Sequence, residues 1–536
     1  MVLSGAKLSD LWLSTPAVVA VSCAVFVIGY LAAPSERERA VLRLPKPSGY
    51  LPILGNTLVV ARAQRSGRFH DWILDHCRKW HGKPWCMHVL GKEPTVILSS
   101  PEAFEDVQKT QFEAFGKNPA FTETAADVLG QGIFAVSGPL WQHQRKTASH
   151  LFSAQMIQQA MEVVVADRCE ALVKRLDSVA RQAHASDRVV SLKPVLDLFT
   201  MDVFAKVGFG VDLHGIETNR NFELLDAFER SFIRALERFQ EPRWYWRLLR
   251  FLNRGPEKQL AKDMKHINDM VYGVIARSME EKINGGTGAT VDEHARKDLI
   301  SLFLDKASVD YANGEQTATD PKLMRDFAVS FLAAGRDSTS TTMSWFVLMM
   351  NRYPKVLARV RQEINEYLPD LATGKQRAPN MEEIQRLVYL DAAVKETLRL
   401  FPVASISGRI ATRDVTMYDG TFLKKGTRVY MPHYTMGRMS TIWGSDVEEF
   451  KPERWIDAAT GKLLVVSPFK FSVFLGGPRV CLGMKFALSE IKITLATLLS
   501  QFDFETLKDP FDYTYHSSVS LKIKGGLDVT VTQIEA

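Results

Sequence analysis

The sequence predicts a mainly α-helical fold of many helices with a small β-rich part, preceded by one transmembrane helix. Helical periodicity dominates residues 101–365. Short β-branched runs indicate strands at 95–98 and within 414–430 and 519–531. These strands do not alternate with helices as βαβ units do, which favours separate α and β parts. An uncharged, mostly apolar run at 11–33 provides the expected membrane span.

Composition sets the broad class of protein. The 536 residues suffice for a large single core or two domains, and the 46% hydrophobic and 24% charged content is ordinary for a globular chain. A net charge of +6 is too small to indicate a nucleic-acid partner. The five cysteines are odd in number and widely spaced, so neither a disulfide framework nor a zinc cluster is expected.

Residues 1–34 are predicted to be an N-terminal membrane anchor, because the apolar run is long enough to cross a bilayer. A cleavable signal peptide is the alternative, but its basic residues would precede a shorter apolar run. Here four basic residues follow within 37–46 and only Lys7 precedes, so the remainder of the chain is expected to face the cytosol. Prolines and glycines predict a stiff linker at 35–56, followed by one catalytic domain at 57–536.

A ten-residue string, FLGGPRVCLG at 474–483, places one cysteine in a glycine-flanked loop before an amphipathic helix. Its defining residues are Phe474, Gly477, Arg479, Cys481 and Gly483. The N–H groups and dipole of a helix N-terminus stabilise a thiolate, and such a thiolate can be the axial ligand of haem iron. Arg479 can pair with a haem propionate. The alternative is a buried structural thiol at Cys481.

The string resembles the haem-binding loop of the cytochrome P450 family, and the resemblance extends from Pro45 to about Val531. It implies the multihelical fold of that family and a haem b held by Cys481. It also implies three further residues near the haem propionates: Trp141, Arg145 and Arg409. On the same resemblance, Glu396, Arg399 and Arg454 form a structural ion-pair network behind the haem.

A long helix is predicted between Asp320-Pro321 and Tyr353-Pro354. A glycine and a run of hydroxyl residues in its middle predict a local bulge there. The segment 334–339, AGRDST, resembles the oxygen-binding helix of the cytochromes P450. In that family an acid and a threonine deliver protons to bound dioxygen. Asp337 matches the acid, and either Ser338 or Thr339 could provide the hydroxyl.

The stretch 239–253 has two interpretations. It combines an apolar side that includes Trp244 and Phe251 with flanking arginines. This pattern suits a membrane interface. It equally suits an ordinary helix with its apolar side in the core and its basic side in solvent.

The amino-acid sequences of two segments, 132–141 and 434–455, resemble those of the plant and fungal long-chain fatty-acid ω-hydroxylases. Ala334 stands where animal ω-hydroxylases often carry a haem-tethering glutamate, so non-covalent haem is expected. Selective attack at a terminal carbon requires a narrow passage that admits the chain end first. The candidates to line it are Phe331, Ala334, Val403 and Ile406, for which ordinary core packing is the alternative.

The resemblance therefore implies a membrane-bound monooxygenase of the endoplasmic reticulum that uses NADPH through NADPH–cytochrome P450 reductase and hydroxylates a lipophilic substrate. Three alternatives stay open. The substrate could be a sterol or an alkane, and the enzyme could be a haem-thiolate isomerase or dehydratase that needs no reductase. The chain could also be a membrane-anchored binding protein with a structural Cys481.

Overall fold

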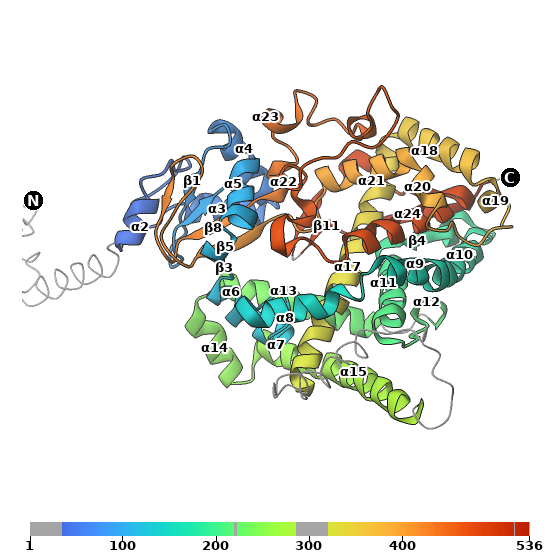
Figure 1. Cartoon of the computed structure of the whole chain (residues 1–536), viewed down its shortest axis with the longest axis horizontal. Coiled ribbons are helices and arrows are strands. Elements are labelled where there is room, and N and C mark those ends of the chain that lie inside the picture. The colour runs from blue at the N-terminus through green and yellow to red at the C-terminus, as the bar shows by residue number, and fades with distance from the viewer. Residues whose placement is uncertain (1–34, 219–221, 286–319, 519, 535–536) are drawn as a thin grey trace, which may run out of the picture.

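The computed structural model describes residues 35–218, 222–285, 320–518 and 520–534. Helices make up most of the molecule, and the largest sheet lies at one end of it beside the first helices (Figure 1). The mainly α class with a small β part is therefore confirmed. In the described part of the chain no helix has the length and apolarity needed to cross a bilayer. The anchor predicted at 1–34 lies outside the described residues.

The largest sheet joins distant parts of the chain. Its strands, in order across the sheet, are β1 (Trp85–Met87), β2 (Thr95–Ile97), β8 (Arg428–Met431), β5 (Ser407–Ala411) and β3 (Phe115–Gly116). The pair β2–β8 is parallel, with Val96 opposite Val429, and the others are antiparallel. The remaining strands are β4 (Val189–Ser191), β12 (Asp528–Gln533) and β9 (Phe502–Thr506) in one sheet, β10 (Tyr515–Ser517) with β11 (Leu521–Ile523), and β6 (Val415–Thr416) with β7 (Phe422–Leu423).

The helices of the first half are α2 (Glu36–Val41), α3 (Thr57–Arg65), α4 (Phe69–Lys79), α5 (Pro101–Glu105), α6 (Pro119–Thr124), α7 (Ala126–Leu129), α8 (Gly138–Ser149), α9 (Ala154–Gln159), α10 (Ala166–Ala180), α11 (Leu192–Phe209), α12 (Gly215–Thr218), α13 (Phe222–Gln240), α14 (Arg243–Phe251) and α15 (Gly255–Gly285). Those of the second half are α17 (Pro321–Arg352), α18 (Pro354–Tyr367), α19 (Pro369–Ala372), α20 (Glu383–Arg386), α21 (Val388–Leu400), α22 (His433–Met436), α23 (Ser440–Trp443) and α24 (Met484–Gln501).

The segment expected to be a linker is folded against the β-rich part. Helix α2 forms at its start, where Ser35 and Glu38 make a capping box. Val41 is only 2% exposed in a core shared with the sheet, and Pro45 accepts a hydrogen bond from the N–H of Cys86 at 2.9 Å. The prolines do keep 44–56 free of helix. The expectation of an extended conformation thus holds for 44–56, and helix α2 departs from it because Val41 has a core to enter.

Helix α17 runs through the middle of the molecule and packs on α11, α21 and α24 (Figure 1). It begins and ends as predicted: the Asp320 side chain accepts a hydrogen bond from the Lys322 N–H at 2.8 Å, and Tyr353 precedes Pro354. Gly335 allows a close approach of α11, because a Cβ there would lie 2.2 Å from the Phe204 ring.

The bulge predicted in the middle of α17 is not formed, since the α-helix is unbroken from Pro321 to Arg352. The hydroxyl groups donate to carbonyls one turn earlier instead of opening the helix. Ser338 donates to the Ala334 carbonyl at 2.6 Å, and Ser344 donates to the Ser340 carbonyl at 2.7 Å. These bonds add to the backbone ladder, so the hydroxyl run is accommodated without a defect.

Candidate active site

The loop that carries Cys481 is fixed by its backbone. Cys481 donates its N–H to the Phe474 carbonyl at 2.8 Å, two residues before Gly483 caps α24. Gly477 has φ +62°, and a Cβ there would lie 1.9 Å from the Gln108 carbonyl oxygen. Only glycine fits that position, so the loop is pressed against residues 106–110. The predicted position of the cysteine just before a helix is confirmed.

Cys481 differs from the other described cysteines, Cys77, Cys86 and Cys169, because it is exposed and they are buried. Burial raises the pKa of the Cys481 thiol, while the Gly483 N–H and the Arg145 guanidinium act in the opposite direction. The Cys481 sulfur therefore has a helix N-terminus and a cation beside it, and both favour a thiolate.

Four cations lie together beside this loop. Arg145 donates to the Val480 carbonyl at 2.8 Å, and the Arg479 guanidinium lies 4.2 Å from the Trp141 ring centre. Burial lowers the pKa of Arg409 to about 10. Burial, Arg409 and Arg145 together lower the pKa of Arg479 to about 10 as well. The fourth cation, Lys117, was not foreseen from the sequence, and burial and the neighbouring arginines hold its pKa well below its usual value.

A buried cation is normally paired with a carboxylate, and these four cations are not. In residues 35–534, leaving out the segments not described, none of the four makes an ion pair with a carboxylate. Such a cluster is costly unless anions enter it. The two propionates of a haem would provide these anions, and the adjacent Cys481 would provide the iron ligand. The donor set thus fits a haem-thiolate group.

The acid on α17 is held by two lysines. Lys193 of α11 lies 3.0 Å from the Asp337 carboxylate and 2.7 Å from that of Asp197, and Lys522 lies 3.6 Å from Asp337. Burial alone opposes ionisation of Asp337, but the lysines and Arg336 hold its pKa well below its usual value. In this arrangement the proton is on Lys193, and Asp337 is the acceptor.

The two candidate hydroxyls face different surroundings. Residues 333–335 and 337–338 of α17 are half-buried and form what we call the open face of the helix. Ser338 belongs to this face. Thr339 is only 2% exposed and turns toward Glu490 of α24. The sequence did not distinguish the two hydroxyls, whereas the structure puts only Ser338 beside Asp337 on the open face.

Glu396, Arg399 and Arg454 meet as the sequence suggested. Arg399 donates to both oxygens of the Glu396 carboxylate at 2.7 and 2.8 Å, and Arg454 lies 3.4 Å from it. Glu396 and Arg399 are 0% and 1% exposed. The Trp455 indole and the Lys451 N–H complete the acceptor bonds at 2.9 Å each. All charges in this network are satisfied, as a buried ion pair requires.

Comparison with known proteins agrees with this geometry. The family model for cytochrome P450 matches residues 45–528. The chain belongs to the cytochrome P450 family. It is 33% identical over 466 residues to cytochrome P450 CYP94D108 of Paris polyphylla, which covers 84% of this chain and 88% of that protein. It is 32% identical over 493 residues to cytochrome P450 86B1 of Arabidopsis thaliana, covering 89% and 83%. With cytochrome P450 704C1 of Pinus taeda it shares 29% identity over 97% of both chains.

The chain is accordingly a haem-thiolate monooxygenase, and its residues can be grouped by what they would do with the haem. The bound haem supplies the iron at which dioxygen is activated. Cys481 would hold the iron, and Lys117, Arg145, Arg409 and Arg479 would hold the propionates beside Trp141. Asp337 and Ser338 would be the proton-handling groups on the open face of α17.

The four residues proposed to line the substrate passage fall into two groups. Ala334, Val403 and Ile406 are half-buried, so each is in contact with open space. Phe331 is 6% exposed and stacks among aromatic rings, with its centre 4.7 Å from Phe327. Phe331 is therefore packed in the core, whereas the other three remain candidates for the passage.

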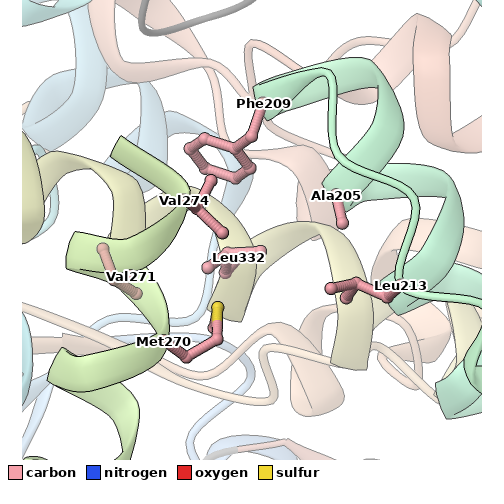
Figure 2. A pocket seen from close by; sticks show the side chains of 7 residues that line it. All are labelled: Ala205, Phe209, Leu213, Met270, Val271, Val274 and Leu332. Atoms are coloured by element: carbon pink, nitrogen blue, oxygen red, sulfur yellow. The ribbon is translucent and has the colours of Figure 1, made fainter. Parts of the chain in front are cut away.

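A separate apolar cavity lies between α11, α15 and α17 (Figure 2). Its lining includes Phe209, Met270 and Leu332, and every lining residue is apolar. Leu332 lines it from α17. Because its lining is apolar throughout, the cavity offers no group for catalysis.

Helix α14 reverses one sequence interpretation. Its apolar side chains point outward: Trp244 is 68% exposed and Phe251 is 86% exposed. Its arginines are more than half exposed, and they still form ion pairs: Arg243 and Arg247 pair with Glu123 of α6, and Arg250 pairs with Asp127 of α7 at 3.0 Å. The interpretation of an apolar side in the core was wrong for Trp244 and Phe251, whereas Trp246 is buried and the basic side does reach solvent.

Proposed function

We propose that this cytochrome P450 hydroxylates long-chain fatty acids, mainly at the terminal carbon, with NADPH and dioxygen. Electrons would arrive through NADPH–cytochrome P450 reductase. The haem would be non-covalent, because Ala334 has no carboxyl group to form an ester with it.

The main support for the proposal is that proton-handling side chains and an apolar side chain lie on the same side of α17. Asp337 and Ser338 share the open face with Ala334, so proton-handling groups and an apolar wall lie within one helical turn. Val403 and Ile406 are half-buried on the segment that follows α21. On this proposal they would extend the apolar wall. An apolar chain end suits such a wall, and a narrow passage favours its terminal carbon.

The exposed apolar side of α14 supports a membrane location. Trp244 and Phe251 form an aromatic surface that suits the headgroup boundary of a bilayer. With the anchor expected at 1–34, the protein would be a single-pass protein of the endoplasmic reticulum with its catalytic domain toward the cytosol. The lipophilic substrate would then be available from the same membrane.

The test is turnover of a substrate panel by the full chain in lipid with reductase and NADPH. Fatty acids of increasing length, an alkane and a sterol are supplied, and products are separated by chromatography. We expect terminal hydroxy acids. Product from the sterol or alkane alone would reject the fatty-acid assignment, and turnover without NADPH would indicate an isomerase or dehydratase.

Regioselectivity tests the passage itself. Ile406→Ala should widen it and increase in-chain hydroxylation at the expense of the terminal product. Ile442→Ala, at an equally half-buried position on α23, is the matched control and should leave the product position unchanged. An unchanged product distribution in Ile406→Ala would remove that residue from the passage.

A further inference from the structure

The segment that carries Ile406 has no regular structure of its own. Residues 401–406, between the end of α21 and the start of β5, belong to no helix or strand. A backbone bond to another element holds part of it, because the Ser405 carbonyl accepts from the Tyr434 N–H of α22 at 3.1 Å. No strand ladder fixes this stretch, so the direction of Ile406 depends on how its neighbours are anchored.

A buried histidine anchors the residue on each side of Ile406. His70 of α4 shares a hydrogen bond with Ser405, from Nε2 to Oγ at 2.9 Å, and His433 of α22 shares one of the same length with Ser407. The two histidines are 2% and 1% exposed. Serine hydroxyls both donate and accept, so each bond forms with either tautomer of the ring. The residues before and after Ile406 are thus tethered to separate helices.

His433 also reaches the loop of Cys481. Its Nδ1 shares a hydrogen bond with the Ser472 hydroxyl at 2.8 Å. Ser472 begins a short 3₁₀ turn, Ser472–Phe474, whose last carbonyl accepts the Cys481 N–H at 2.8 Å. One imidazole ring therefore lies between the segment that carries Ile406 and the turn that holds the backbone of Cys481.

Both histidine rings are neutral, and the ring of His433 is confined. Burial lowers the pKa of His70 to about 4, and burial together with Arg409 lowers that of His433 to about 3. A neutral ring needs no buried counter-ion, so serine hydroxyls suffice as its partners. The Phe104 ring meets the His433 ring edge-on, with 5.5 Å between their centres, and restricts its rotation.

We propose that His70 and His433 are positioning residues that set where Ile406 lies, and that His433 also fixes this position relative to the Cys481 loop. Each histidine acts through a serine. The role of Ile406 in the substrate passage rests on the proposed function, whereas the tethers themselves do not. A displacement of about 1 Å can change a rate roughly a hundredfold, so a wall residue held from both sides favours one carbon over its neighbours.

The first test measures the position of Ile406 without turnover. Isoleucine methyl groups are labelled with carbon-13 in the full chain with bound haem, and NMR spectra are recorded in the reduced, carbon-monoxide-bound state. Ile406→Ala assigns the signal by its loss. His70→Phe and His433→Phe should both shift this signal. His76→Phe, at another half-buried histidine of α4, is the matched control and should leave it in place. An unmoved signal in both tether variants would overturn the proposal.

The second test separates the two histidines. The EPR g values of the resting ferric haem respond to its thiolate ligand. His433→Phe and Ser472→Ala should both shift them, whereas His70→Phe should not. Ser500→Ala, which removes another buried serine hydroxyl from α24, is the control and should also leave them unchanged. Unchanged g values in both His433→Phe and Ser472→Ala would reject the link to the Cys481 loop.

The third test rests on the proposed function and measures the ratio of terminal to in-chain hydroxy acid. Loss of one tether should lower this ratio about fivefold in Ser405→Ala and in Ser407→Ala, and Ser500→Ala should not change it. The two tether variants also replace a phenylalanine variant that does not fold in the NMR test. An unchanged ratio with a shifted Ile406 signal would reject the effect on the choice of carbon. If no fatty acid is turned over, the proposed function fails, while the NMR and EPR spectra still decide the tethers.

Discussion

Replacing Glu490 by glutamine should make stability less dependent on pH. The ordinary pKa of glutamate is 4.5, and burial raises that of Glu490 to about 8. The folded protein therefore holds this proton more tightly than the unfolded chain does. The stabilisation is complete below about pH 4.5 and is lost as the pH rises toward about 8.

The magnitude follows from the shift. At pH 7 the difference of about 2.5 pH units from the unfolded pKa corresponds to about 3 kcal/mol of lost stability. Glutamine does not titrate and escapes this loss. A constant cost of the amide does not change the slope, so the stability of the variant relative to wild type should rise by about 1.4 kcal/mol per pH unit between about pH 5 and 8.

Urea unfolding, followed by tryptophan fluorescence at several pH values, measures this slope. Glu505→Gln removes the same charge from an exposed position on β9 and serves as the control for charge loss alone. The reasoning would be refuted if Glu490→Gln and wild type kept a constant difference in unfolding free energy over this range.

Three further perturbations test the rest of the site. Cys481→Ser should abolish the thiolate-type spectrum of the reduced, carbon-monoxide-bound protein, because a hydroxyl is a much weaker ligand than a thiolate; a normal band would reject the ligand assignment. Glu396→Gln should lower the free energy of unfolding by about 3–5 kcal/mol in urea, because it leaves the buried Arg399 without its anion; a loss near zero would contradict the network. Asp337→Asn should retain haem but release more peroxide per NADPH. The folded pKa of Asp337 lies below its usual value, so its stabilisation is present above about pH 4 and lost in acid, a loss that the variant should not show.

Features that depend on a few neighbouring residues could be predicted from the sequence. The ends of α17 follow from Asp320-Pro321 and Tyr353-Pro354, whose effects on the backbone are local. The loop around Cys481 follows from a compact string in which glycine is required at Gly477. These parts are correct because they do not require knowledge of what packs on them.

Features that depend on distant partners could not be predicted in the same way. Lys117 stands in an ordinary stretch of sequence, and only folding brings it to two arginines, Arg409 and Arg479. Glu490 left no such signal, because α24 also carries Lys485 and Lys492, and its burial depends on how α24 packs on its neighbours. The direction of α14 could not be read from its amphipathic pattern, since the pattern does not reveal Glu123 and Asp127.

The orientation of α14 has a consequence for how salt would act on the protein. The ion pairs to α6 and α7 involve half-exposed arginines and are weakened as ionic strength rises, whereas the contact with lipid that we propose for Trp244 and Phe251 would not be. A salt wash would thus loosen the helix from its own domain without releasing it from a bilayer. Detergent would do the opposite, leaving α14 attached to α6 and α7 and freeing its aromatic side.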